Sequence, residues 1–308
     1  MSAEADMATV NVPLFDPTAP LTPSGNLGRR RAVDGVVRVV TALAAAIGVA
    51  MLLLVVYSVV TKGAAALSLG FVFGNPQGLV GGGIFNSLLG TAEVVLLGAA
   101  VALPLGVLTG LYLTEFAGTA SRSGSALKLG LDIMQGLPTI VVGLFVYGLL
   151  VIPLKKESGF AAAVALAIVM LPLMARAAQE VLLLVPAGYR EAADALGVNR
   201  WRTVLTVILP AATGGIATGA ILATARAAGE TAPLLIVNSI FNTQTTQVNP
   251  AQGISSVPMY IFTVTEQAVP DVFVRAWGAA FVLLVIILFA NVLARVLLAR
   301  SRAKIGAS

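Results

Sequence analysis

The chain has 308 residues, of which 58% are hydrophobic and only 11% are charged, and its formal net charge is +5. So little charge excludes an ordinary soluble globular protein of this size, whose surface carries far more charged side chains. Cysteine and histidine are both absent, which excludes disulfide bonds and thiolate chemistry and removes the commonest metal ligand and general base.

The N-terminal 28 residues contain four prolines between Pro13 and Pro23 and show little apolar periodicity. This composition predicts a disordered tail, which we place over residues 1–35. We expect no cleavable signal peptide, because the first apolar run begins late and is too long. The cluster Arg29-Arg30-Arg31 precedes that run.

Six apolar runs are long enough to cross a bilayer, which takes about 20 residues. The sequence therefore predicts an all-α membrane protein with a transmembrane domain over residues 36–300 and a short tail over 301–308. The fifth run is longer than one crossing requires, so we expect it to be tilted, kinked or partly outside the membrane. Four prolines in or beside the runs are candidate kinks: Pro104, Pro138, Pro172 and Pro210. The runs are approximately Val39–Val60, Ile84–Leu113, Leu129–Ile152, Phe160–Ala175, Val204–Ile236 and Val272–Leu298.

Lysine and arginine predict the orientation of these runs. With the N-terminus inside, six crossings place thirteen of these residues on the cytoplasmic side and four on the outer side, a clear positive-inside bias. Both termini and the loop over residues 176–204 are then cytoplasmic. Because the basic residues flank apolar runs, they read as topology signals, and we expect no nucleic-acid partner. The inner set is Arg29, Arg30, Arg31, Arg38, Arg122, Lys128, Arg190, Arg200, Arg202, Arg295, Arg300, Arg302 and Lys304; the outer set is Lys62, Lys155, Lys156 and Arg275.

Charges inside apolar runs point to function, since each costs a few kcal/mol at the bilayer centre. Arg226 and Glu230 lie four residues apart in the fifth run, hence on one helix face, and Arg176 and Glu180 repeat this spacing at the inner end of the fourth. Guanidinium suits an oxyanion because its planar fork donates two parallel hydrogen bonds. Arg226 and Arg176 are therefore candidate anion contacts, with Glu230 holding Arg226 between passages.

Other interpretations of these charges stay open. The Arg226–Glu230 pair would equally serve as a buried ion pair that fixes helix packing. Arg176 would equally be an interfacial arginine whose head reaches toward water. Glu93, the charge in the second run, either pairs with an arginine of another helix or lies near the outer surface. The outer segment 237–271 is polar and reads as a solvated loop or as a re-entrant piece lining a cavity.

A motif stands between the fourth and fifth runs. Glu191-Ala192-Ala193 precedes Gly197, and nine residues further on Val207-Ile208-Leu209-Pro210 follows. This pattern resembles the EAA loop of ABC-importer permeases, with Val207 where the family usually has Ile, and we place the EAA loop at about residues 186–210. In that family the loop is a cytoplasmic helix-turn-helix that docks on the ATPase. An ordinary amphipathic loop is the alternative interpretation of the same residues.

Individual residues of the EAA loop fit that role. Gly197 tolerates the positive φ that a turn between two short helices requires. Arg200, Trp201 and Arg202 suit an interface that combines charge with an aromatic anchor. The residues expected to couple to the ATPase are Glu191, Ala192, Ala193, Gly197, Leu209 and Pro210.

Further motifs narrow the resemblance over about residues 80–300, and the most specific is Gly229-Glu230-Thr231-Ala232-Pro233. The chain is similar to the permease subunits of Pst-type phosphate ABC importers, and more to the A-type subunit than to its C-type sister. The other motifs are Gly82-Gly83-Ile84, Asn86-Ser87, Gly90-Thr91, Pro104-Leu105-Gly106, Gly110-Leu111-Tyr112-Leu113, Glu115-Phe116 and Gly136-Leu137-Pro138-Thr139.

This resemblance implies a type I ABC-importer bundle of six helices in the bacterial plasma membrane. It implies a second, C-type permease, two copies of a cytoplasmic ATPase, and an extracytoplasmic binding protein that delivers inorganic phosphate. It also implies that Arg176, Arg226 and Glu230 belong to the translocation path. No phosphate-cradling G-x-x-x-x-G-K-[ST] motif occurs in the chain, so we expect no bound cofactor and no ATP hydrolysis by this subunit alone.

Three rival functions remain to be weighed. A permease for another anion, such as sulfate or molybdate, would carry the same EAA loop, and only the resemblance favours phosphate. A membrane-embedded enzyme needs clustered catalytic groups, which the apolar runs do not supply. A passive channel or scaffold has no reason to carry an ATPase dock.

Overall fold

The computed structural model describes residues 26–77, 81–117, 121–238, 248–267 and 270–305. It divides into two compact units, Met1–Val56 and Tyr57–Ser308. The described part of the first unit is most of helix α1 (Leu27–Gly63), which starts with the arginine cluster and continues through exposed apolar side chains. Residues 27–35, which we expected in the tail, are thus helical, and the rest of the expected tail lies almost entirely outside the described residues.

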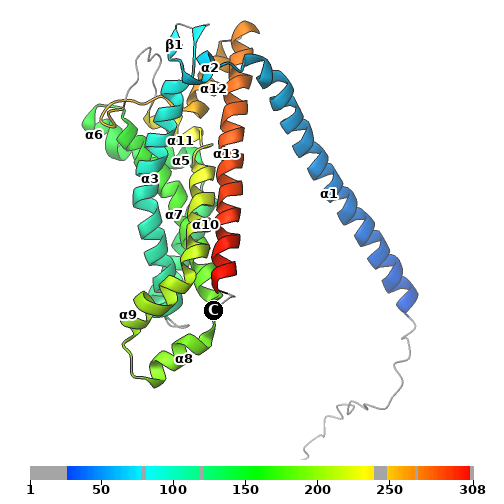
Figure 1. Cartoon of the computed structure of the whole chain (residues 1–308), viewed down its shortest axis with the longest axis vertical. Coiled ribbons are helices and arrows are strands. Elements are labelled where there is room, and N and C mark those ends of the chain that lie inside the picture. The colour runs from blue at the N-terminus through cyan, green and yellow to red at the C-terminus, as the bar shows by residue number, and fades with distance from the viewer. Residues whose placement is uncertain (1–25, 78–80, 118–120, 239–247, 268–269, 306–308) are drawn as a thin grey trace, which may run out of the picture. The chain divides into compact units, whose positions relative to one another are not determined.

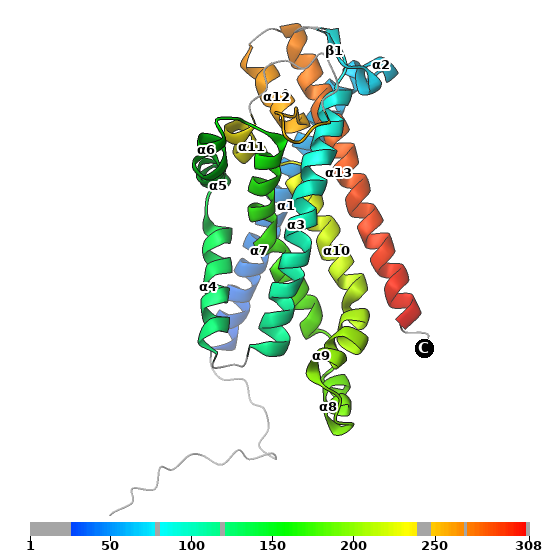
Figure 2. The same ribbon diagram turned by 90° about the vertical axis from the view of Figure 1, so that its left-hand side faces the viewer.

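The second unit is a bundle of long helices, seen from two sides in Figures 1 and 2. Helices α3, α7 and α10 lie side by side, and α13 packs along α10. Short helices α8 and α9 lie at one end of the bundle, and α2, α12 and a small strand pair lie at the other. Its principal helices are α3 (Phe85–Leu111), α4 (Arg122–Gly136), α5 (Thr139–Val146), α7 (Gly159–Leu183), α10 (Leu209–Ala227), α12 (Val257–Glu266) and α13 (Pro270–Ile305).

Small residues bring α3 and α7 into close contact at the centre of the bundle. A Cβ atom added at Gly106 would lie 2.7 Å from the Met174 Cβ, and one added at Gly110 would lie 2.8 Å from the Ala178 Cβ. Apolar helices gain little from mutual burial in lipid, so packing this close is what holds them together. The α3–α7 contact therefore forms the rigid centre on which the other helices rest.

The third predicted run is not one straight helix. Helix α4 ends at Gly136, α5 begins at Thr139, and the two axes are bent by 102°. The break falls at Leu137-Pro138, because proline donates no backbone hydrogen bond and keeps the preceding residue out of the helical region. The second half continues through the π-helical turn η3 (Tyr147–Val151) into α6 (Ile152–Leu154). Pro104 and Pro172, in contrast, lie inside unbroken helices.

The fifth predicted run is also divided. It starts with α9 (Arg200–Thr203) and the π-helical turn η4 (Val204–Ile208), and α10 follows to Ala227. The chain then breaks over residues 228–231 before α11 (Ala232–Val237). Of the tilt, kink or partly extramembrane course expected for this run, the structure shows a break, at Gly229-Glu230.

The end of the bundle away from α8 is built from short elements. Helix α2 (Leu69–Phe73) leads into strand β1 (Pro76–Gln77), which pairs antiparallel with β2 (Gly81–Gly82). The described parts of segment 237–271 are partly buried rather than fully solvated. Asn238 is fully buried and accepts a hydrogen bond from the Ile254 backbone N–H at 2.8 Å, and α12 packs on α13. Its polar residues 239–247 lie outside the described residues.

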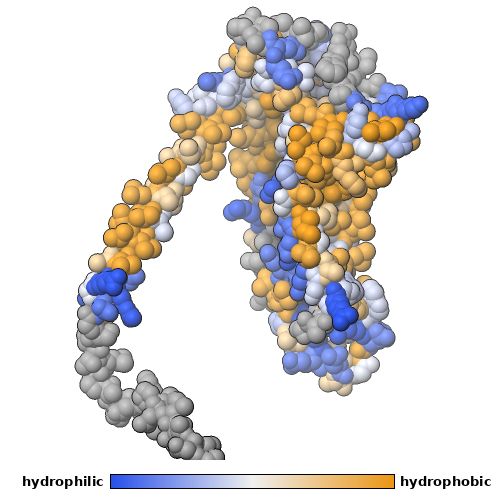
Figure 3. All heavy atoms as spheres, turned by 180° about the vertical axis from the view of Figure 1, so that it is seen from behind, coloured by the Kyte–Doolittle hydropathy of each residue, from blue (hydrophilic) through white to orange (hydrophobic). Residues whose placement is uncertain are grey.

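Within the described residues, length and composition identify five helical segments that can cross a membrane, and the bent pair α4–α6 makes a sixth if it is one span. Figure 3 shows hydrophobic colouring over the middle of the second unit, interrupted by a strip of hydrophilic residues, with further hydrophilic colouring toward its ends. Helix α13 extends to Ile305, beyond the expected start of the C-terminal tail. The five segments are Leu27–Ala66, Phe85–Phe116, Gly159–Leu183, Arg200–Ala227 and Val272–Leu293.

Candidate functional site

The EAA loop forms two helices joined by a tight turn. Helix α8 (Ala187–Ala195) ends at Gly197, which has a φ of +67°. The Gly197 N–H donates to the Asp194 carbonyl at 3.0 Å and the Val198 N–H donates to the Ala193 carbonyl at 3.0 Å, the pair of bonds that closes a Schellman motif. The predicted role of glycine in this turn is confirmed. The Asn199 side chain then caps α9 by accepting from the Trp201 N–H at 3.0 Å.

Helix α8 presents most of its surface outward. Ala193 is the one buried residue on the helix, while Glu191 and Ala192 are exposed. Leu196 is 81% exposed and Trp201 is 54% exposed. Exposed apolar and aromatic side chains beside a carboxylate are suited to an interface with another protein. The arrangement of these residues therefore suits a docking helix.

The last two residues of the motif join this loop to a long helix. Leu209 packs against a buried apolar cluster, and Pro210 is exposed in the first turn of α10. Pro210 follows the π-helical turn η4 almost directly. Because α9, η4 and α10 follow one another without interruption, a movement at Trp201 can pass directly into the span. The cluster consists of Leu111, Leu182, Val185, Val204, Ile208 and Ala212, with Val107, Phe116, Val181, Leu209 and Ile216 packed against it.

Arg176 pairs with a residue that our sequence reasoning missed. Its guanidinium forms an ion pair with Asp132 of α4 and donates to the Gln179 side-chain oxygen at 3.4 Å. Helix α7 continues to Leu183, so Arg176 lies inside the helix rather than at its end. Asp132 could have been found, because it is the charge within the third apolar run.

Arg226 and Glu230 do not lie on one helix face, contrary to the expectation from their spacing. Helix α10 ends at Ala227, and Glu230 lies in the break before α11. Among the described residues, no hydrogen bond or ion pair joins the two side chains. The physical reason is Gly229, which together with Pro233 ends one helix and starts the next. Glu230 therefore does not hold Arg226 in the described conformation.

Arg226 lines a small cavity at the bend between α4 and α5. The cavity has a volume of about 50 Å³, enough for a few water molecules. Both arginines thus face the same stretch of α4: Arg176 contacts Asp132, and Arg226 shares the cavity with Met134 and Gln135. The other lining residues are Leu137, Thr139, Val142, Val169, Pro172 and Leu173.

Glu93 of α3 is another charge within a predicted apolar run. One of its carboxylate oxygens is buried and has no hydrogen-bond partner among the described residues. It forms no ion pair with a described arginine, so the expected pairing with another helix is absent there. The position of Glu93, early in α3, is toward the end of the bundle away from α8.

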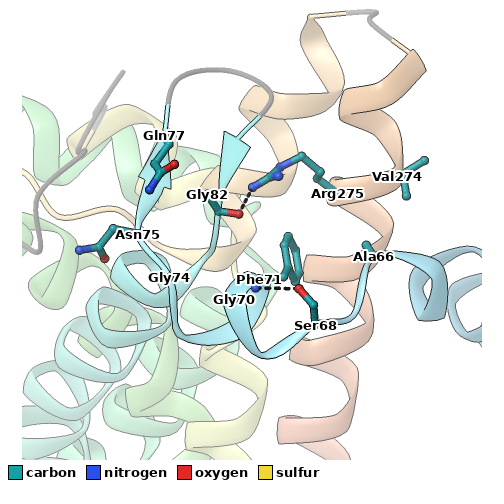
Figure 4. A pocket seen from close by; sticks show the side chains of 10 residues that line it. All are labelled: Ala66, Ser68, Gly70, Phe71, Gly74, Asn75, Gln77, Gly82, Val274 and Arg275. Atoms are coloured by element: carbon teal, nitrogen blue, oxygen red, sulfur yellow. Dashed lines mark hydrogen bonds between the residues drawn. The ribbon is translucent and has the colours of Figure 1, made fainter.

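A larger pocket, of about 570 Å³, lies at the end of the bundle away from α8 (Figure 4). Arg275 is the charged side chain among the described lining residues, and it points toward the strand pair. It donates to the Gly82 carbonyl at 2.6 Å and to the Gly81 carbonyl at 2.9 Å, and it lies over the Phe71 ring at 5.4 Å. Because its donors hold the backbone of this end together, we do not assign the pocket to the anion site.

No group of three or more metal-ligating carboxylates occurs within the part of the chain that the structure describes. The candidate site thus combines two arginines that face α4, Arg176 and Arg226, with the exposed helix α8 at one end of the bundle. This combination suits movement of an anion that is driven by a second protein.

Comparisons with known proteins agree with this arrangement. Residues 102–303 match the family model "Binding-protein-dependent transport system inner membrane component". The chain is 35% identical over 257 residues to the phosphate transport system permease protein PstA of Yersinia pestis, covering 83% of this chain and 86% of the relative. It is 36% identical over 250 residues to the PstA of Haemophilus influenzae, covering 81% and 88%.

The fold agrees as well. A bacterial alginate ABC transporter, solved in complex with an alginate pentasaccharide-bound periplasmic protein, has a chain that matches with a TM-score of 0.60. The match covers 88% of this chain and 97% of that chain, at 14% identity, so it supports the fold alone. The fold is that of a type I ABC-importer permease, and the chain belongs to the family of binding-protein-dependent transport system inner membrane components, among the PstA-type permease proteins.

Proposed function

We propose that this chain is the A-type permease subunit of an ATP-driven importer of inorganic phosphate in the bacterial inner membrane. The observation that carries the proposal is the identity of 35–36% with phosphate transport system permeases over more than four fifths of the chain. Two arginines at one stretch of α4 support it, because guanidinium groups bind oxyanions through paired hydrogen bonds. The subunit itself binds no cofactor.

The subunit works within a larger assembly. A C-type permease lies beside it, two copies of an ATPase bind on the cytoplasmic side, and a binding protein delivers phosphate from outside. The excess of lysine and arginine supports cytoplasmic termini and a cytoplasmic EAA loop. The exposed Glu191, Ala192 and Trp201 support docking of the ATPase at α8 and α9. ATP is hydrolysed by that partner and not by this chain.

Phosphate passes the bend between α4 and α5. Arg226 attracts the anion at the bend, and Arg176 receives it further along α7. Asp132 has the role that we expected of Glu230. It forms an ion pair with an arginine between transport events, and the passing anion displaces it from that arginine. The Arg176 and Asp132 side chains are 31% and 58% exposed, so water screens their attraction and the pair is weak enough to exchange. Glu230, in the break beside Arg226, keeps the local charge balanced.

ATP binding closes the ATPase dimer and moves the docking helix α8. The movement enters α10 through α9 and η4, and enters α7 directly. The bundle then opens outward, accepts phosphate from the binding protein, and later reopens inward. The cavity of about 50 Å³ at Arg226 has to widen during this cycle, because it holds only a few waters.

The proposal is tested by uptake into vesicles that contain the chain with its sister permease, ATPase and binding protein. We expect ATP-dependent uptake of radiolabelled phosphate that excess unlabelled sulfate and molybdate do not compete away. Uptake of sulfate or molybdate in place of phosphate would leave the importer fold and remove the substrate assignment. An assembled complex that moves none of these anions would contradict the proposal as a whole.

A further inference from the structure

The end of helix α3 carries a buried carboxylate beside the docking helix. Helix α3 runs into the π-helical turn η2 (Tyr112–Phe116), where Glu115 is only 2% exposed. A buried carboxylate is costly unless it is paired and hydrogen-bonded. Single π-helical turns within helices are often found at functional sites. The position of Glu115 therefore calls for a specific partner.

The partner is Arg190, which directly precedes Glu191 on α8. The Arg190 Nη2 donates to the Glu115 Oε1 at 2.7 Å, and Nε lies 3.2 Å from both carboxylate oxygens. The side chain of Glu115 is 1% exposed and that of Arg190 is 27% exposed. The hydrogen bond to Glu115 and the charge of its carboxylate raise the pKa of Arg190, against a lowering by burial. Arg190 thus stays charged at physiological pH.

Arg190 also donates hydrogen bonds to the C-terminal end of α7. Its Nη1 donates to the Val185 carbonyl at 2.8 Å, and its Nη2 donates to the Leu182 carbonyl at 3.1 Å. These carbonyls lie at the C-terminal end of α7, where backbone acceptors lack helical partners and the helix dipole favours a cation. One guanidinium therefore connects α8 to the ends of both α3 and α7, the two helices of the rigid centre.

The residue after Glu115 makes the matching contact with the other half of the EAA loop. The Phe116 ring packs on the Trp201 ring of α9 with centroids 4.9 Å apart, and the Arg200 guanidinium lies 6.0 Å from the Phe116 centroid. Of these two consecutive residues of η2, Glu115 thus contacts α8 and Phe116 contacts α9. Since Ala193 is the one buried residue of α8, the polar contacts of Arg190 are its principal attachment to the bundle.

We infer that Glu115 and Arg190 are positioning residues that transmit movement of the docking helix to α3 and α7. The inference rests on the proposed function, because it takes α8 as the ATPase dock. Directional hydrogen bonds from one guanidinium to three acceptors resist sliding and rotation, whereas apolar packing of α8 alone would let it move without the bundle. The ring contact between Phe116 and Trp201 adds an attachment of α9 to the same turn η2.

The test compares uptake of phosphate per ATP hydrolysed in the reconstituted complex. Glu115→Gln and Arg190→Ala are each expected to lower this ratio about tenfold, a usual size for coupling between two sites. The ATPase should still co-purify with the chain, and Arg190→Lys should recover part of the ratio because it keeps the charge. Arg122→Ala, which removes an exposed arginine at the start of α4, is the matched control and should keep the wild-type ratio.

A double variant separates coupling from folding. Glu115→Leu/Arg190→Leu replaces the pair with apolar side chains, which often preserves or raises stability. We expect this variant to assemble and hydrolyse ATP with a lowered ratio, and it decides the matter if the single variants fail to fold. A wild-type ratio in the double variant would overturn the inference. Failure of the proposed function is distinct, because it would appear in the wild-type complex as hydrolysis without phosphate uptake.

Discussion

Asp132 of α4 forms an ion pair with Arg176 of α7, across 44 residues of sequence. Both side chains are partly exposed in the isolated chain, at 58% and 31%. Exposed pairs contribute little to stability, commonly about 0–1 kcal/mol, so this pair is better suited to exchange than to hold the fold. On the proposed path, this keeps the arginine in place without binding it too tightly to meet an anion.

Neutralising Asp132 should change the apparent KM and the maximal rate of phosphate uptake. In Asp132→Asn, phosphate no longer competes with a carboxylate for Arg176, so we expect the apparent KM for uptake to fall about two- to fivefold, the range of an exposed ion pair. The maximal rate should fall as well, since release of the anion becomes slower. The measurement is the concentration dependence of uptake in vesicles, with Lys128→Gln, an exposed charge change on the same helix, as control. An unchanged KM would show that Asp132 does not compete for the arginine.

The effect of a substitution at Gly197, in the turn after α8, should depend on backbone conformation alone. Gly197 has a φ of +67° and open space around its Cα, so a larger side chain meets no steric clash. Alanine in the left-handed region costs about 1–2 kcal/mol, whereas asparagine adopts this region routinely. We expect Gly197→Ala to weaken binding of the ATPase about five- to thirtyfold and Gly197→Asn to bind nearly as wild type.

The affinity of the detergent-solubilised permease pair for the ATPase measures this effect. Equal losses in both Gly197 variants would indicate that side-chain bulk at the interface matters, and no loss in either would remove the turn from the docking mechanism.

The close approach of α3 and α7 should make a single methyl group costly. In Gly110→Ala the new Cβ would lie 2.8 Å from the Ala178 Cβ and 3.0 Å from the Gln179 backbone nitrogen. Overpacking of this kind typically costs about 1–3 kcal/mol. We expect a lower apparent melting temperature for Gly110→Ala and no decrease for Gly130→Ala, which places the same methyl group in open space on α4. Equal melting temperatures would mean that the two helices can separate without cost.

The sequence was sufficient for most of the long helices and for the two short helices of the EAA loop. Long apolar runs and the Gly197 turn follow from local chemistry, so α3, α7, α13 and the α8–α9 pair correspond to the predicted segments. The break at Pro138 was among the predicted kinks and is observed, whereas the break at Gly229-Glu230 could not be located from the sequence, because the apolar run continues through it although the helix does not. The spacing of Arg226 and Glu230 suggested a helix face only under the assumption that the helix continued.

The ion pairs could not be deduced from sequence spacing. Asp132 and Arg176 meet because α4 packs on α7, and Glu115 and Arg190 meet because the EAA loop turns back on the end of α3. Both acidic residues stand in or at the end of apolar runs, which marks them as unusual. Which arginine each one meets depends on the tertiary packing of the helices.

The most direct test of the account is phosphate uptake by the Arg226→Gln complex. Arg226 lines the cavity at the bend of α4 and α5, and glutamine keeps much of its length without the charge. We expect ATP-dependent phosphate uptake to fall about 100-fold or more, since a charged hydrogen bond of about 1.5–3 kcal/mol and the long-range attraction are lost together. Assembly with the ATPase should be unchanged, and Lys128→Gln should transport as wild type. An Arg226→Gln complex that assembles and transports phosphate at the wild-type rate would contradict the claim that this chain forms the anion path.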